Sequence, residues 1–152
     1  MSSAEPAGAA APLGESEQLR RRRAMPDLFV STPYVSWLGM VVERYEPDEV
    51  TMRLSWRHEL TNDGRNYHGG VVSSALDTAG GLAAFSNHDF DRGIRAATIS
   101  LTVQFVAGAG GADILCHARV LRRVRELIFT EITGADPDGR VLAHAVQTYR
   151  IA

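Results

Sequence analysis

Two kinds of hydrophobic pattern run along this chain. Residues 69–85 are apolar or small at almost every position and carry a single charge, Asp77. A helix without a polar face is normally buried, so this stretch predicts one long central helix. Other runs alternate apolar and polar positions or are short and apolar, which predicts six strands: 41–45, 49–56, 94–106, 112–124, 126–133 and 141–151.

The predicted order of elements is two strands, a helix and four strands. Short breaks separate the later strands, and Asp136–Gly139 is a strong hairpin turn, so these strands are expected to pair antiparallel. We therefore expect an α+β fold in which a six-stranded antiparallel sheet wraps around one long central helix. This domain should cover residues 35–152, after a disordered tail at 1–14 and a short helix with a linker at 15–34, the helix ending at Pro26.

Length, charge and cysteine content limit the class of protein. A chain of 152 residues suits one domain with a sizeable core, and 45% apolar with 22% charged residues is an ordinary globular composition. The net charge of −2 argues against a nucleic-acid partner, and the Arg20–Arg23 run is expected to be a solvated helix face. One cysteine allows no intrachain disulfide, and no stretch of about 18 apolar residues occurs, so we expect a cytoplasmic protein without a membrane partner.

Asp77 is the first candidate for chemistry, because a lone carboxylate on a buried helix costs several kcal/mol unless something uses it. Gly69 and Gly70 leave the unpaired amide donors of the helix start uncovered, so an oxyanion could approach them closely. Gly69 and Asp77 are eight residues apart, which is about 12 Å along a helix axis. One substrate atom cannot touch both in the same chain. If both groups act on one bond, they come from two chains, and the spacing then predicts a dimer with active sites across its interface.

These residues resemble a family signature. Asn62, the triplet His68–Gly70 and Asp77 look like the Asn, His-Gly-Gly and Asp pattern of hotdog-fold acyl-CoA thioesterases, in particular the phenylacetic-acid-degradation type. Residues 97–105 are similar to the third strand of that family. The resemblance covers residues 35–151 and implies a hotdog fold that hydrolyses an acyl- or aryl-CoA thioester to the free acid and coenzyme A.

The resemblance also implies roles for single residues. Asp77 would be the general base or the nucleophile, and the residues leave this choice open. The Gly69 amide would donate to the oxyanion, and Asn62 would orient the water or the thioester. His68 would hydrogen-bond the substrate or, as we favour, hold Asn62 and the loop in place. Thr98 matches the position where relatives carry Ser or Thr to hold the attacking water.

Substrate binding is expected at two further places. Gly70 adjoins the oxyanion donor. Arg122, Arg123 and Arg125 are candidates for the CoA phosphates, because Arg makes forked contacts with phosphate, and the alternative is that they are ordinary surface charges. The histidines and the cysteine show no metal-ligand spacing, so neither a metal nor a cofactor is expected. The expected assembly is a homodimer, and beyond it a tetramer built as a dimer of dimers.

Other interpretations of the same residues remain open. Asp77 could cap a second helix beginning at Thr78, Asn62 could only close an Asx-turn, and Thr98 could be an ordinary strand residue. At the level of function, the alternatives are a hotdog dehydratase or hydratase acting on 3-hydroxyacyl thioesters, or a non-catalytic acyl-CoA-binding module. The presence of Asp77 argues against the binding module.

Overall fold

The computed structural model describes residues 11–152, so most of the expected tail lies outside the described part. This part contains three α-helices, α1 (Glu15–Ser31), α2 (Pro33–Leu38) and α3 (Gly69–Ser86), with short 3-10 turns η1 (His58–Leu60) and η2 (Phe90–Arg92). The strands are β1 (Met40–Glu46), β2 (Glu49–Leu54), β3 (Ala96–Phe105), β4 (Ile114–Val124), β5 (Leu127–Ala135) and β6 (Val141–Ile151).

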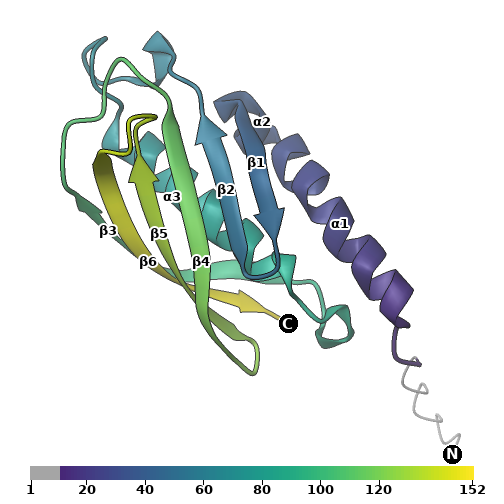
Figure 1. Cartoon of the computed structure of the whole chain (residues 1–152). Coiled ribbons are helices and arrows are strands. Elements are labelled where there is room, and N and C mark those ends of the chain that lie inside the picture. Colours follow the sequence, from purple (N-terminus) through teal and green to yellow (C-terminus); the bar gives the residue numbers. More distant parts are fainter. Residues whose placement is uncertain (1–10) are drawn as a thin grey trace, which may run out of the picture.

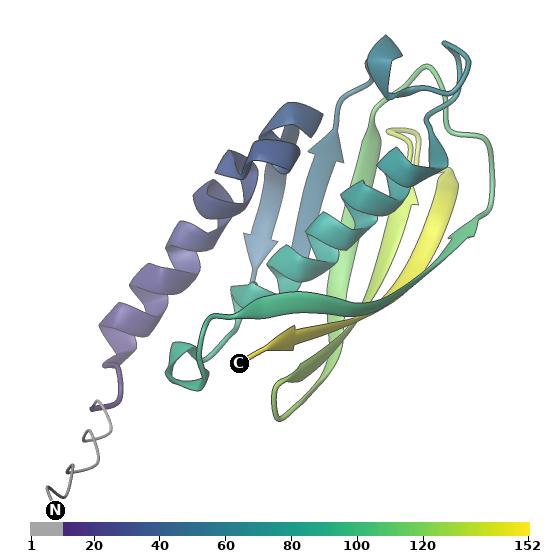
Figure 2. The same ribbon diagram turned by 180° about the vertical axis from the view of Figure 1, so that it is seen from behind.

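All six strands form one antiparallel sheet in the order β1-β2-β4-β5-β6-β3. The sheet curves around α3, which crosses its concave side, while α1 lies beyond the β1 edge (Figure 1, Figure 2). β1 and β3 are therefore the two edges of the sheet. The predicted sheet around one long helix is confirmed.

The core lies between α3 and the concave face of the sheet. Leu76 and Leu82 on α3 are fully buried, and Met52, Ile114 and Ile132 meet them from the strands. Burying a side chain of this size contributes roughly 1.5–3 kcal/mol relative to leaving it exposed. The small residues between these leucines let α3 approach the sheet closely. This packing limits the directions in which the Asp77 side chain can point.

The prediction that the first helix ends at Pro26 is wrong, because α1 continues through this proline to Ser31. Proline has no amide hydrogen, so inside a helix it leaves the carbonyl four residues earlier without its usual donor. Here that carbonyl belongs to Arg22, and it accepts a hydrogen bond of 2.9 Å from the Tyr45 hydroxyl on β1. The missing intrahelical bond is thus replaced by one that ties α1 to the sheet.

A short helix that the hydrophobic pattern did not predict, α2, joins α1 to β1. Pro33 occupies its start and Gly39 ends it with φ 71°, the arrangement in which proline opens a helix and glycine closes it. A helix of about a turn and a half is too short to show a helical repeat of hydrophobic residues. The proline–glycine pair is therefore the feature of the sequence that indicates it.

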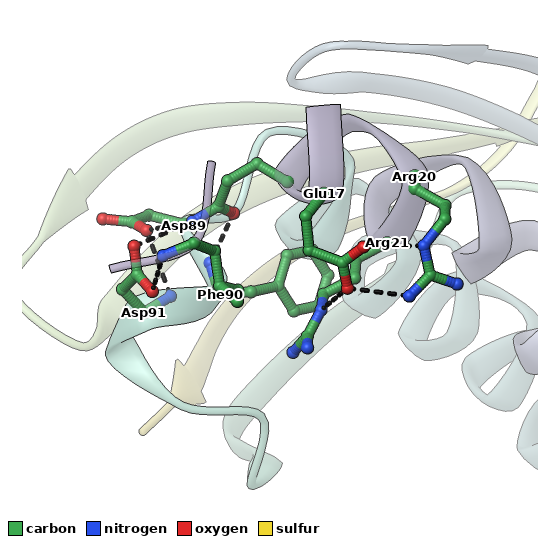
Figure 3. A network of polar contacts seen from close by, with 8 residues as sticks. Glu17, Arg20, Arg21, Asp89, Phe90 and Asp91 are labelled. Atoms are coloured by element: carbon green, nitrogen blue, oxygen red, sulfur yellow. Dashed lines mark hydrogen bonds and ion pairs between the residues drawn. The ribbon is translucent and has the colours of Figure 1, made fainter. Parts of the chain in front are cut away.

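The N-terminal part of α1 is fastened to the loop after α3 (Figure 3). The Gln18 amide donates to Asp89 at 2.9 Å and accepts from the backbone N–H of Phe90 at 2.9 Å. On the outer face, hydrogen bonds from Arg20 and Arg21 lower the pKa of Glu17 to about 2. Two arginines of the basic run therefore pair within their own helix.

Candidate active site

Asp77 lies in the middle of α3, which is unbroken from Gly69 to Ser86. The alternative in which Asp77 caps a second helix at Thr78 is therefore excluded. Its side chain is half-buried and reaches the wall of a cavity of about 270 Å³. The one charge of an otherwise apolar helix thus faces an opening in the fold.

One oxygen of the Asp77 carboxylate is fully occupied and the other is free. Oδ1 accepts hydrogen bonds of 2.7 Å from the Thr98 hydroxyl and 2.7 Å from the Gln147 amide. Within residues 11–152, no hydrogen bond is made by Oδ2. Thr98 lies on β3 beside an irregularity in the pairing with β6, between positions 98 and 100, and such bulges re-aim side chains. The carboxylate is held from one side and open on the other.

Residues from five elements, α1, α2, α3, β3 and β6, line the cavity. Gly81 on α3 leaves room between two rings, since a Cβ there would contact Tyr149 at 3.2 Å and Phe29 at 3.4 Å. Burial, with the charge of Asp77 adding to it, raises the pKa of Tyr149 to about 12, so its phenol stays protonated at neutral pH. The residues that line the cavity besides Asp77 are Phe29, Thr32, Val35, Thr78, Gly81, Thr98 and Tyr149.

The start of α3 presents one open amide. His68 is the N-cap residue, and its Nδ1 accepts a hydrogen bond of 2.9 Å from the Gly70 N–H, which fixes the ring with its proton on Nε2. The carbonyl of His68 accepts from the amides of Val71 and Val72. Among the described residues, the Gly69 N–H has no hydrogen-bond partner. It is an unpaired donor at the positive end of a long helix.

The structure brings the predicted residues together in two groups rather than one. Asp77 and Thr98 meet at the cavity, whereas His68 and Gly69 lie about 12 Å further along the helix axis by the rise of an α-helix. Asn62 lies in the exposed loop before α3, where its backbone N–H donates to Asn66, and it does not line the cavity. One chain alone does not place the amide, Asn62 and the carboxylate around a common atom.

The three arginines proposed for phosphate differ in their surroundings. Arg123 donates to Asp48 at 2.6 and 2.9 Å and to the carbonyl of Ala84 at 2.8 Å, so its guanidinium caps the end of α3. Arg122 and Arg125 at the β4–β5 turn are exposed. Within the part of the chain that the structure describes, neither guanidinium makes a hydrogen bond, so both can contact an anion.

Sequence reasoning missed Gln147, which contacts the carboxylate directly, and the two rings of Phe29 and Tyr149. A glutamine in an alternating strand has no distinctive spacing, and Phe29 lies beyond the predicted helix end. Cys116 is fully buried, and burial raises its thiol pKa to about 12, which makes it a poor nucleophile. Within residues 11–152, no group of three His, Cys, Asp or Glu side chains is placed to hold a metal.

The family of this chain follows from its sequence as well as its fold. The Thioesterase superfamily profile matches residues 64–143, the span from the loop before α3 into β6, and the chain belongs to this family. A Halobacterium salinarum protein that carries the provisional name of an esterase is 34% identical over 106 residues, covering 68% of this chain and 70% of that protein. The superfamily and this relative support thioester hydrolysis as the general activity. The sheet around α3 is the hotdog fold expected for it.

Solved structures repeat the same architecture. The Escherichia coli PaaI protein from the phenylacetic acid degradation operon superposes with a TM-score of 0.76 at 16% identity, covering 91% of this chain and 96% of that one. A Streptococcus mutans protein solved with acetyl-CoA bound superposes with a TM-score of 0.67 at 18% identity, covering 74% and 88%. At these identities the likeness shows the fold, and membership of the phenylacetic-acid type stays a prediction. In the described part of the chain, no helix is both long and apolar enough to cross a membrane.

Proposed function

We propose that this protein hydrolyses acyl-CoA thioesters, with Asp77 as the catalytic carboxylate. The observation that carries the proposal is the state of Asp77 in its cavity, with Oδ1 held by Thr98 and Gln147 and Oδ2 free. A carboxylate fixed on one side and open on the other is suited to act on a reactant that enters the cavity. The acetyl-CoA in the Streptococcus mutans neighbour supports coenzyme A as the thiol.

Two routes use the same carboxylate. As a general base, Asp77 takes a proton from water while the water oxygen attacks the thioester carbon; as a nucleophile, it forms a mixed anhydride that water then opens. In both, the carbonyl oxygen becomes an oxyanion, the carbon–sulfur bond breaks, and coenzyme A leaves as the thiol. The sulfur gains its proton from protonated Asp77 in the first route and from water in the second. The Gly69 amide is the proposed oxyanion donor, a contribution of about 2.7–4 kcal/mol when well placed.

The donor is proposed to come from a second chain, because Gly69 and Asp77 of one chain are too far apart. The β3 edge of the sheet supports this assembly, since no further strand pairs with it within residues 11–152 and it exposes Ile99 and Phe105, each at 57%. An exposed apolar edge strand is a site for pairing with another strand. In a C2 dimer the arrangement occurs twice and gives two equivalent sites. The proposal extends to a tetramer built from two such dimers. The proposed location of the protein is the cytoplasm.

The shape of the cavity supports a compact acyl or aryl group. Its aromatic walls, Phe29 and Tyr149, are separated by Gly81, and its volume is about 270 Å³. Arg122 and Arg125 are the proposed contacts of the CoA phosphates, and Arg123, held at the end of α3, contributes less to binding than the sequence suggests. Hydrolysis is favoured over a non-catalytic binding module because binding alone would not require a half-buried, oriented carboxylate.

The test is an assay of free thiol release from a panel of aryl- and alkyl-CoA thioesters. The wild type should hydrolyse at least one of them, and the Asp77→Asn variant should fail on the same substrate. A panel on which the wild type binds CoA thioesters without releasing thiol would favour the binding module. Hydration of an enoyl-CoA in place of hydrolysis would favour the hydratase alternative.

A further inference from the structure

Gln147 on β6 connects the Asp77 carboxylate to a buried hydroxyl. It is 2% exposed, and its Nε2 donates to Asp77 Oδ1 at 2.7 Å and to the Asp77 backbone carbonyl at 3.0 Å. Directly opposite on β5 lies Thr130, 1% exposed, whose hydroxyl donates to Gln147 Oε1 at 3.0 Å. The three side chains form a chain of hydrogen bonds from the sheet to the helix.

The orientation of the Gln147 amide is fixed by chemistry. Both atoms of Asp77 that it meets are acceptors, so only the NH₂ end can face them, and a flipped amide would place three oxygens against one another. The carbonyl end then needs a donor inside the core, and the hydroxyl of Thr130 is that donor. A buried amide with either end unsatisfied would be costly, so each bond supports the other.

The helix is shaped to admit this side chain. A Cβ at Gly80 would overlap the Gln147 carbonyl oxygen and come within 3.1 Å of Ile132. Gly80 is three residues after Asp77 and faces the sheet, where any other residue would push the amide away. The absence of a side chain at Gly80 thus makes room for the Gln147 side chain to reach from β6 to the Asp77 carboxylate.

We propose that Gln147, oriented by Thr130, is a positioning residue that fixes the Asp77 carboxylate and makes Oδ2 the reacting oxygen. This inference rests on the proposed hydrolysis and adds to it the identity of the reacting atom. Thr98 and Gln147 occupy Oδ1, and the unoccupied Oδ2 takes the proton of water or attacks the thioester carbon. Gln147 does not touch the substrate, and it acts through Asp77.

Removal of the donor should lower kcat and leave substrate affinity nearly unchanged. In Gln147→Leu the carboxylate loses one of two anchors, and misplacement of a reacting group by about 1 Å can cost about 100-fold in rate. We expect kcat to fall about 10- to 100-fold with KM within about threefold of wild type. Thr130→Val, nearly isosteric, should give a smaller loss of kcat. Thr133→Val on the same strand is the matched control and should retain the wild-type rate.

A second variant separates positioning from packing. In Gln147→Glu the volume is kept, but the new carboxyl group donates to Asp77 only while it is protonated. Its rate relative to wild type should therefore rise about tenfold or more between about pH 8 and about pH 5.5. Parallel pH profiles for the two proteins, or wild-type kcat in folded Gln147→Leu, would overturn the positioning role.

The inference can fail separately from the proposed function. If the wild type hydrolyses no thioester in the panel, the proposed function fails. The hydrogen bonds of Gln147 can still be tested by NMR, from the solvent exchange of its ¹⁵N-attached side-chain amide protons. They should be protected from solvent exchange in the wild type and lose protection in Asp77→Leu. Unprotected Gln147 protons in the wild type would show that the hydrogen bonds to Asp77 are absent and would overturn the inference.

Discussion

At its first turn α3 leaves the Gly69 amide without a partner in the described part of the chain, whereas at its last turn Arg123 reaches across from β4 to the carbonyls of Ala83 and Ala84. Every α-helix has unpaired amides at one end and unpaired carbonyls at the other. Here the fold supplies donors to the carbonyls of Ala83 and Ala84 and leaves an amide open. The difference agrees with the proposed function, in which the end of the helix contributes to stability and its start faces the thioester.

The last turn is tied down by more than the guanidinium. Asp48, in the β1–β2 turn, accepts from Arg123 and from the Asn87 amide at 2.8 Å, and its backbone N–H donates to Ser86 at 2.7 Å. The β1–β2 turn, β4 and the end of α3 therefore meet at the Asp48 carboxylate. Changes at the start and middle of α3 should cost activity and spare the fold, and changes at its end should do the reverse.

The largest effect is expected at Asp77. Asp77→Asn keeps the size of the side chain and removes the negative charge that the base or nucleophile needs, so kcat should fall at least about 100-fold. Thermal unfolding should change little, since an amide can still accept from Thr98 and Gln147. Asp138→Asn in the exposed β5–β6 turn is the control. Turnover by folded Asp77→Asn within about threefold of wild type would remove Asp77 from the mechanism.

A somewhat smaller effect is expected at Gly69. A Cβ at this position already lies 3.4 Å from the Phe105 ring, and the branched side chain of Gly69→Val would crowd the thioester oxygen while leaving the amide in place. We expect kcat/KM to fall about 10- to 100-fold with an unchanged far-UV circular dichroism spectrum. Full activity would mean that no oxyanion approaches this end of the helix.

Mixing the two impaired variants tests whether the two halves of the site come from different chains. After Asp77→Asn and Gly69→Val chains are refolded together, a heterodimer has one site with both defects and one with neither. With statistical exchange about a quarter of the wild-type activity should return, as expected for a C2 dimer with shared sites. Heterodimers that are isolated and remain inactive would contradict the shared site.

The sequence predicts the start and middle of α3 better than its end. Asp77 stands out because it is the only charge in an apolar run, and the glycines stand out because they open a helix. Arg123 looks like its exposed neighbours in the sequence, and only the fold brings it to Asp48, 75 residues away. Gln147 is similar, since a partner 70 residues away defines its role. A residue that departs from the pattern of its own segment, such as Asp77, can be recognised in the sequence. A residue whose role depends on a partner far away in the chain, such as Arg123 or Gln147, cannot.

At the last turn, Arg123→Leu should lower stability without touching the chemistry. It removes donors from two carbonyls and leaves Asp48 with fewer partners, so the free energy of unfolding should fall by about 1–3 kcal/mol. For a chain of this length that is a fall in Tm of about 2–12 °C. Arg140→Leu, at an exposed hairpin, is the control. A Tm equal to that of the control would show that the guanidinium is not needed at the helix end.

The smallest expected effect is a pH dependence of local stability at the last turn of α3. His88 is 5% exposed, packs edge-on against Phe85 and Phe90, and donates from Nε2 to the Gly93 carbonyl at 2.9 Å. Burial lowers its pKa below the ordinary 6.5, and the nearby positive charge of Arg123 adds to this. The unfolded chain therefore binds a proton more readily than the folded one.

The stability that depends on neutral His88 should be fully present above about pH 6.5 and be lost as the pH falls toward the lowered folded pKa. Amide hydrogen exchange tests where this occurs. Between pH 7 and pH 5, after correction for the intrinsic rate, exchange should accelerate at residues 83–88 more than at residues 71–76. His88→Gln should reduce this difference, and His58→Gln, on an exposed side chain, should not. Equal acceleration along the whole of α3 would show that its two ends do not differ in the way the contacts indicate.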